Sequence, residues 1–188
     1  MIAKSIKLFN GMIFMLFFVQ SSLIAQDNNM RSQSTVPRDS LLKLSRTIID
    51  SAKCRVLITT DENGIPHARE MSPFPPEEDM VIWLGTNPLT RKAKQIEKNP
   101  NVVMYYYDSK TLSYVSIQGK AQLVNDSALK TKYWKDYWNR YYPDRDKDYI
   151  LIKIIPVRLE IMSFGHNILW LTESYLPHSV EFDYVDVK

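Results

Sequence analysis

The sequence contains a succession of β-type segments joined by short turns, and this pattern restricts the possible folds more than any other feature. Apolar or alternating runs cover residues 55–60, 65–71, 80–84, 102–107, 112–124, 149–163 and 168–172. Pro156 leaves the run at 149–163 as one strand or two. Consecutive strands with short turns favour antiparallel pairing over a doubly wound sheet. We therefore predict a mainly β fold with flanking helices, in which six or seven antiparallel strands form a barrel.

Two local signals refine this strand pattern. Asp61-Glu62-Asn63-Gly64 joins the first two runs, and its Asn-Gly pair is typical of a hairpin turn. Gly119 interrupts the long run at 112–124. A glycine inside a strand indicates a bulge or a close approach by another group.

Three helices are expected around the strands. The first spans residues 39–52 and places its apolar side chains on one face. The second follows Gly85. The third runs from about 126 to 141, ends before Pro143, and carries an aromatic stripe that we interpret as packing. Four-residue spacing defines that stripe: Leu129, Tyr133, Tyr137 and Tyr141.

Composition excludes several classes of protein. The chain has 188 residues, 45% of them hydrophobic, which suits one domain with a real core. Its net charge of +3 comes without a long Lys/Arg run, so nucleic acid is not an expected partner. A single cysteine, Cys54, excludes a disulfide framework and a cysteine-rich metal site, and we expect its thiol to be buried. No metal site is predicted.

The N-terminus has the pattern of an export signal. Lys4 and Lys7 precede an apolar stretch over residues 11–24, and Ala25 is followed by polar residues. We interpret residues 1–25 as a signal peptide, with an uncleaved membrane anchor as the alternative reading. Residues 26–37 are polar and lack periodicity, so they are expected to form a flexible leader. The mature protein should then be exported to the periplasm, without a membrane anchor.

One strand-turn-helix segment has the makings of an anion site. We expect the strand at 80–84 to break at Gly85 and a helix to begin near Pro88, capped by Thr86 or Asn87. Leu89, Ala93 and Ile96 would form its buried stripe. The other face presents Arg91 and Lys92. A hydroxyl, two cations and free helix N–H groups suit a phosphate dianion, although a capped helix with a solvated basic face fits the same spacing.

With these segments in this order, the chain resembles the flavin-binding split-barrel proteins related to pyridoxamine 5'-phosphate oxidase, and within them the general stress protein branch. Four stretches between Leu41 and Ser163 carry the resemblance. They are Gly64-Ile65-Pro66-His67-Ala68-Arg69-Glu70-Met71, Thr86-Asn87-Pro88-Leu89-Thr90-Arg91-Lys92-Ala93, Asn99-Pro100-Asn101-Val102 and Val115-Ser116-Ile117-Gln118-Gly119-Lys120-Ala121.

The resemblance implies a split β-barrel domain over residues 38–173, a tail over 174–188, and FMN bound at a homodimer interface. Arg69, Met71 and Ser72 would contact the flavin, and Thr86, Arg91 and Lys92 would hold its phosphate. Ser116 and Gln118 would approach the ring or ribityl chain, from the same or the partner subunit. Arg69 paired to a strand glutamate is the competing structural role.

The chain departs from the family's oxidase members where they grip pyridoxamine phosphate. Met162 stands in place of a tryptophan, and no Arg-x-His-x-Arg segment follows it. The resemblance therefore implies an exported FMN-binding oxidoreductase acting on a small molecule, but not that oxidase. The alternative is a non-catalytic module that binds flavin or haem for storage, sensing or a stress response. No residue set identifies a catalytic group or a substrate.

Overall fold

A computed structural model describes residues 36–172 and 174–184 of the chain. The predicted signal peptide and most of the predicted leader lie outside the described residues. The strands are β1 (Cys54–Thr60), β2 (Pro66–Glu70), β3 (Ile82–Thr86), β4 (Asn101–Asp108), β5 (Ser113–Val124), β6 (Ile150–Ser163) and β7 (His178–Glu181). The helices are α2 (Arg38–Ser51), α3 (Arg91–Lys98), α4 (Ser127–Lys132), the 3₁₀-helix η1 (Asp136–Arg140) and α5 (Arg145–Asp148).

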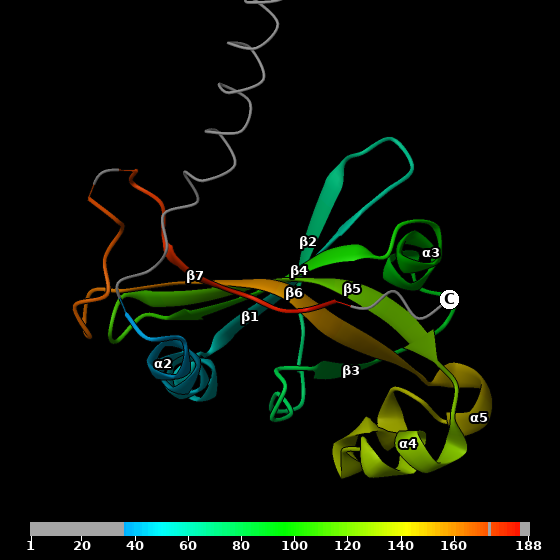
Figure 1. Ribbon diagram of the computed structural model, residues 1–188. Coiled ribbons are helices and arrows are strands. Elements are labelled where there is room, and N and C mark those ends of the chain that lie inside the picture. The colour runs from blue at the N-terminus through cyan, green and yellow to red at the C-terminus, as the bar shows by residue number, and fades with distance from the viewer. Residues whose placement is uncertain (1–35, 173, 185–188) are drawn as a thin grey trace, which may run out of the picture. The chain divides into compact units, whose positions relative to one another are not determined.

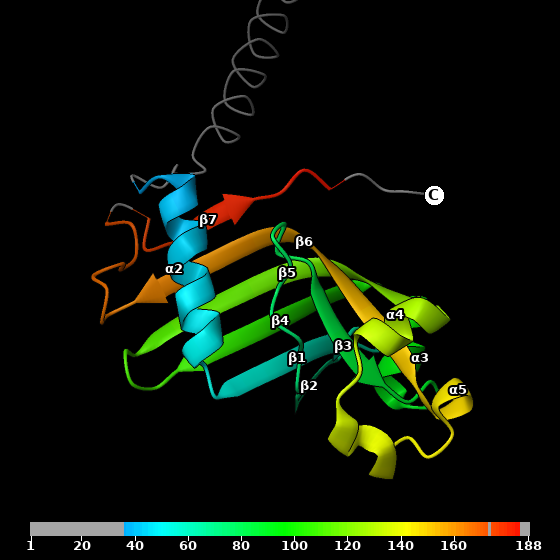
Figure 2. The same cartoon turned by 90° about the horizontal axis from the view of Figure 1, so that it is seen from below.

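The strands form one antiparallel seven-stranded sheet, which confirms the predicted fold class. Their order is β2-β1-β4-β5-β6-β3, and β7 pairs with β6. The path ends at β2 and β3 without joining them, so the sheet curls without closing. Figure 1 shows α2 and β3 on the same side of the long central strands, and Figure 2 shows α2 lying across them.

The core lies between α2 and the inward face of the sheet. Strand β4 shows why, because Val102, Met104 and Tyr106 are buried and alternate with partly exposed neighbours. Helix α2 contributes the buried face that includes Leu41 and Ile48. These two residues belong to the apolar stripe predicted for the first helix. The helix itself is confirmed, and its ends differ from the predicted residues 39–52 by one residue each.

Gly119 confirms the predicted bulge and close approach. The β5–β6 register shifts between Gln118 and Gly119, and Gly119 pairs with Pro156. A Cβ on Gly119 would lie 2.6 Å from the Ile155 carbonyl oxygen. Pro156 cannot donate a ladder hydrogen bond, and proline is tolerated in a sheet at such a bulge. Strand β6 therefore continues through Pro156 as one strand.

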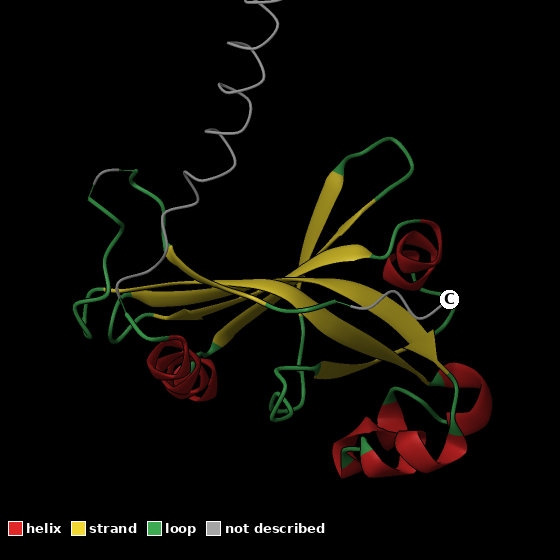
Figure 3. Cartoon of the chain, viewed as in Figure 1, coloured by secondary structure: helices red, strands yellow, loops and turns green. Residues whose placement is uncertain are grey.

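The long third helix is a wrong prediction. Residues 127–148 form three short helical segments instead, α4, η1 and α5, all drawn at one corner of Figure 3. Tyr133 and Trp138 are both buried in a second apolar cluster with Trp83 of β3. Tyr137 and Tyr141, by contrast, are 52% and 60% exposed. Tyr133 and Trp138, which are five residues apart, are the ones that pack against β3. The predicted stripe with a spacing of four therefore does not form one buried helix face.

The boundary between β3 and the next helix also differs from the prediction. Strand β3 continues through Gly85 and Thr86, and α3 begins only at Arg91, so Leu89 is 78% exposed. The Asn87 side chain accepts a hydrogen bond from the Leu89 N–H at 2.8 Å, which turns the chain before the helix starts. Ala93 and Ile96 remain buried, as expected.

The C-terminal part contains a strand that the sequence pattern did not reveal. The expected strand at 168–172 is reduced to a bridge between Ile168 and Ser163. Strand β7 lies instead within the segment expected to be a tail.

Cys54 is exposed rather than buried, since it starts β1 at the rim of the sheet. Among the described residues, no helix combines the length and apolarity needed to cross a membrane.

Replacing Gly119 with alanine should destabilise the fold by about 1–3 kcal/mol, because the new Cβ meets backbone rather than a flexible side chain. Urea unfolding would measure the change. Gln122→Ala, an exposed substitution in the same strand, is the control and should stay within about 0.5 kcal/mol of the parent. Equal stability of the parent and Gly119→Ala would contradict the close approach.

Candidate anion and cofactor site

Three cations gather where β2 meets α3. Arg69 lies on β2 and is half-buried, Arg91 opens α3 and is exposed, and Lys92 follows it and is half-buried. Burial lowers the pKa of Arg69, and the charge of Arg91 lowers it further. Burial and the charge of Arg69 likewise lower the pKa of Lys92. Arg69 therefore interacts as a like charge with both Arg91 and Lys92.

No carboxylate compensates this cluster in the described part of the chain. None of the ion pairs there includes Arg69, Arg91 or Lys92. The competing role for Arg69, an ion pair with a strand glutamate, is therefore absent from these residues. Like charges held together at partly desolvated positions favour binding of an anion, because it removes their mutual repulsion.

A partly buried chain of hydrogen bonds fixes the Arg69 guanidinium. Its Nη1 donates to Thr59 Oγ1 at 2.7 Å and to the Leu57 carbonyl oxygen at 3.2 Å. Thr59 in turn donates to Gln95 Oε1 at 2.6 Å. Gln95 also receives a longer contact of 3.4 Å from Arg69 Nη2. This chain joins β1, β2 and α3, so it holds the arginine in place before any ligand arrives.

Thr86 ends β3 beside the same helix. Its side chain is buried, and its Oγ1 lies 3.2 Å from Thr90 Oγ1. Thr90 is the N-cap residue of α3, and its hydroxyl donates to the Asn87 carbonyl oxygen at 2.8 Å. No side-chain capping hydrogen bond is made to the helix N–H groups of α3. The turn thus places two hydroxyls and the helix start next to Arg91 and Lys92.

Met71 and Ser72 follow β2 at its other end. Met71 is half-buried and packs against the main core. Ser72 is exposed, and Lys135 Nζ donates to its Oγ at 2.8 Å and to its carbonyl oxygen at 3.0 Å. Tyr137 Oη lies 3.4 Å from the same Oγ, and this contact together with the charge of Lys135 lowers the pKa of Tyr137. The segment between α4 and α5 therefore contacts Ser72 through Lys135 and Tyr137.

Ser116 and Gln118 lie away from this group within one subunit. Ser116 pairs with Tyr105 and Gln118 with Val103, on the sheet face opposite the buried Met104 and Ile117. Arg69 pairs with Leu57, which faces the core. Because paired residues in a ladder project to the same side, Arg69 lies on the core-facing side and Ser116 and Gln118 lie on the other face. Arg91 and Lys92 interact with Arg69, and Thr86 adjoins the same helix through Thr90.

Sequence reasoning missed three residues at this site: Thr90, Gln95 and Lys135. Gln95 offered a signal, because it adjoins Ile96 on the buried side of α3 yet is polar. A buried amide requires hydrogen-bond partners, and these came from distant strands that no spacing within the helix reveals. Lys135 gave no signal, since it reaches Ser72 only through the break between α4 and η1.

Metal chemistry finds no support among the described residues. No group of three His, Cys, Asp or Glu side chains there is placed to hold a metal ion. The exposed Cys54 therefore has no ligand cluster around it in that part of the chain.

Comparison with known proteins gives a consistent family. A family profile described as "Pyridoxamine 5'-phosphate oxidase like" matches residues 39–161. The chain is 32% identical over 124 residues to General stress protein 26 of Bacillus subtilis (strain 168), covering 64% of this chain and 86% of that protein. The crystal structure of General Stress Protein 26 from Bacillus anthracis str. Sterne aligns with a TM-score of 0.60 and 27% identity, covering 76% of this chain and 98% of that one.

A more distant structure shares the fold. A pyridoxamine 5'-phosphate oxidase-related, FMN-binding protein from Nostoc punctiforme aligns with a TM-score of 0.55 at 18% identity, covering 69% of this chain and 85% of that one. The profile match spans α2 to β6 and so includes the whole basic cluster. The chain therefore belongs to the pyridoxamine 5'-phosphate oxidase-like family.

Proposed function

We propose that this protein is an FMN-binding flavoprotein. The observation that carries the proposal is the uncompensated cluster of Arg69, Arg91 and Lys92 beside the Thr86 hydroxyl. A phosphate dianion would neutralise this cluster and accept its hydrogen bonds, whereas riboflavin, which has no phosphate, would leave it unused. The FMN-binding protein that shares this fold supports the choice of a flavin.

Different residues would hold the phosphate and the ring of the cofactor. Arg69, fixed by Thr59 and Gln95, would present a preorganised guanidinium to the phosphate. Met71 and Ser72, further along the same chain segment, would lie towards the isoalloxazine. FMN supplies hydride or electron transfer when bound, and the protein contributes binding, orientation and electrostatics.

The proposed activity is an oxidoreduction of a small molecule other than pyridoxamine phosphate. Met162 lies on the open sheet face, paired with Tyr114. The oxidase residues that grip pyridoxamine phosphate have no equivalents after it. A non-catalytic module that binds flavin or haem is the second candidate, and it rests on the same absence of an identifiable substrate group.

The open sheet face supports a homodimer with the flavin at its interface. Val103, Tyr105 and Ser116 lie on this face and are only half-buried within one subunit. The stacked rings of Tyr105 and Tyr114, with centroids 5.6 Å apart, add apolar area there. In such a dimer, the partner's Ser116 and the partner's Gln118 would contact the flavin that this subunit's basic cluster holds. Within one subunit, Ser116 and Gln118 lie on the sheet face away from that cluster.

Removing the phosphate-binding charges should abolish the preference for FMN over riboflavin. Charge-assisted hydrogen bonds contribute about 1.5–3 kcal/mol each, so the parent chain should bind FMN at least about tenfold more tightly. In Arg91→Gln/Lys92→Gln the two dissociation constants should agree within about threefold. Flavin fluorescence titration measures both constants, and light scattering checks that the variant remains a dimer.

The control variant is Lys43→Gln/Lys110→Gln, which removes two charges at exposed positions away from the cluster. It should keep the parent's preference. A second variant adds Thr86→Ala to the first pair of changes and should copurify without flavin. If the charge-deleted chain still selects FMN, our placement of the phosphate is wrong. A Soret band in the purified parent would favour the haem alternative.

Turnover separates the enzyme from the binding module. When the FMN-loaded chain is mixed with a reduced nicotinamide and an electron acceptor, the nicotinamide should reduce the bound flavin and the acceptor should reoxidise it, in repeated cycles. These cycles should be faster than those of free FMN at the same concentration. Stopped-flow absorbance of the flavin bands provides the rates. Rates no greater than those of free FMN would support a module without turnover of its own.

Export is proposed from the charge and apolar pattern of residues 1–25. When the full chain is produced in a bacterium with a periplasm, we expect the periplasmic fraction to contain a chain that starts near Gln26. N-terminal sequencing would show this. Leu16→Arg, which puts a charge in the apolar stretch, should keep the chain in the cytoplasm. An unprocessed parent chain in the cytoplasm would contradict export.

A further inference from the structure

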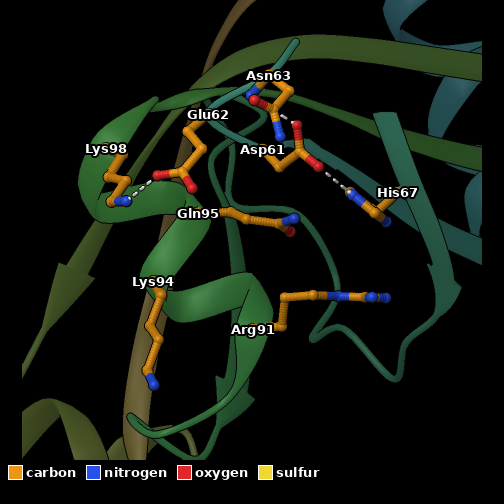
Figure 4. Close-up of a pocket in the computed structure, with 8 residues that line it drawn as sticks. All are labelled: Asp61, Glu62, Asn63, His67, Arg91, Lys94, Gln95 and Lys98. Atoms are coloured by element: carbon orange, nitrogen blue, oxygen red, sulfur yellow. Dashed lines mark hydrogen bonds and ion pairs between the residues drawn. The ribbon is translucent and has the colours of Figure 1, made fainter. Parts of the chain in front are cut away.

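A cleft lined by polar and charged residues adjoins the basic cluster. It lies between the β1–β2 turn and α3 and has a volume of about 290 Å³. Figure 4 shows the Arg91 and Gln95 side chains extending from α3 towards the side that carries His67. The lining residues are Asp61, Glu62, Asn63, His67, Arg91, Lys94, Gln95 and Lys98. This volume is near the lower end for small-molecule sites, which are lined mostly by apolar residues, so a set of lining residues that are all polar or charged indicates a charged ligand.

The charges of the cleft do not balance. Asp61 Oδ2 lies 2.8 Å from His67 Nε2, and Glu62 is paired with Lys98. The carboxylates therefore already have partners. Among the ion pairs of the described residues, none involves Arg91 or Lys94. Three Lys or Arg side chains line the cleft against two carboxylates, so its net charge is positive and attracts an anion.

Gln95 supplies an independent sign of a ligand. The residue is only 6% exposed, and its Nε2 is buried without a hydrogen-bond partner. Its Oε1 is already held by Thr59 and Arg69, which fixes the amide with its nitrogen unsatisfied. A buried N–H group without an acceptor costs about 1–3 kcal/mol, so an acceptor from a ligand in the cleft would be stabilising.

The cleft continues the flavin site along β2. His67 lines the cleft, Arg69 belongs to the phosphate cluster, and Met71 follows at the far end of the strand. Arg91 belongs to both the cluster and the cleft. A ligand with its ring near Met71 and its phosphate at Arg69 would meet this cleft immediately beyond that phosphate.

We propose that the cleft binds a second phosphate group, placed beyond the phosphate of the flavin. The inference rests on the proposed flavin function. The group belongs either to the ligand itself, as in the pyrophosphate of FAD, or to a separate nucleotide bound beside FMN. In both cases Arg91 stands between the two phosphates, the Gln95 amide donates to the second one, and Lys94 at the rim adds positive charge.

A charge reversal at the rim tests this subsite without touching the flavin phosphate cluster. The full-length parent chain, Lys94→Glu and the matched control Lys43→Glu are titrated with FMN and with FAD. Lys94→Glu should raise the dissociation constant of FAD at least fivefold and that of FMN less than twofold. Lys43→Glu, which changes the same charge at an exposed position on α2, should change neither by more than twofold.

A third titration identifies the source of the phosphate. ADP is added to the FMN-loaded parent and to FMN-loaded Lys94→Glu. ADP that binds the loaded parent at least fivefold more tightly than the loaded variant, without displacing FMN, supports a separate nucleotide. ADP that binds only the flavin-free chain, together with the FAD result above, supports a dinucleotide ligand.

Two results would overturn the proposal, and they are distinguishable. If FMN binds but neither FAD nor ADP affinity responds to Lys94→Glu, the second subsite is wrong and the flavin site stands. If the parent binds neither FMN nor FAD, the proposed flavin function fails and this inference fails with it.

Discussion

The pairing of β5 with β6 is the interaction on which the rest of the structure depends. Its register runs from Ser113 opposite Ser163 to Val124 opposite Leu151. Strand β4 pairs with the outer edge of β5, and β3 pairs with the first part of β6. The bulge at Gly119 and Pro156 lies within this ladder, where a bulge increases local twist and bends the strands. The sheet can therefore curl so that β3 lies on the same side as α2 (Figure 1).

That curl decides where the basic cluster lies. Thr86 at the end of β3 and α3 immediately after it lie beside the β1–β2 hairpin, which pairs at the opposite end of the strand order. The Thr59–Gln95–Arg69 hydrogen bonds join these two ends. An open sheet can bring its ends together in this way without a shared ladder. The site is consequently built across the split between β2 and β3 rather than on a single element.

The electrostatic interactions within the cluster destabilise the folded chain. Burial, and after it the repulsion between Arg69 and its neighbours Arg91 and Lys92, lowers the pKa values of Arg69 and Lys92, so folding disfavours their charged forms. Strained or unfavourable arrangements of this kind are typical of functional sites, where a ligand relieves them. The unsatisfied Gln95 Nε2 next to the cluster fits the same view, because a bound phosphate oxygen would accept from it.

The amino-acid sequence by itself determined the succession of strands from β1 to β6, the first hairpin, the bulge at Gly119 and the position of the cations Arg91 and Lys92 near the start of one helix. These features depend on local periodicity, turn residues and spacing, which are properties of neighbours in the chain. Family resemblance added Arg69, which the structure places close enough to Arg91 and Lys92 to interact with their charges. Ser116 and Gln118 came from the same source and lie on the opposite face of the sheet.

Only the tertiary structure decided the rest. It broke the expected helix at 126–141, because burial of Tyr133 and Trp138 against Trp83 outweighed helical spacing. It added β7, whose four residues acquire strand geometry by pairing with β6. It also recruited Gln95 through partners on β1 and β2. In each case the deciding contacts join segments far apart in sequence, and local pattern carries no information about which distant surface a segment will meet.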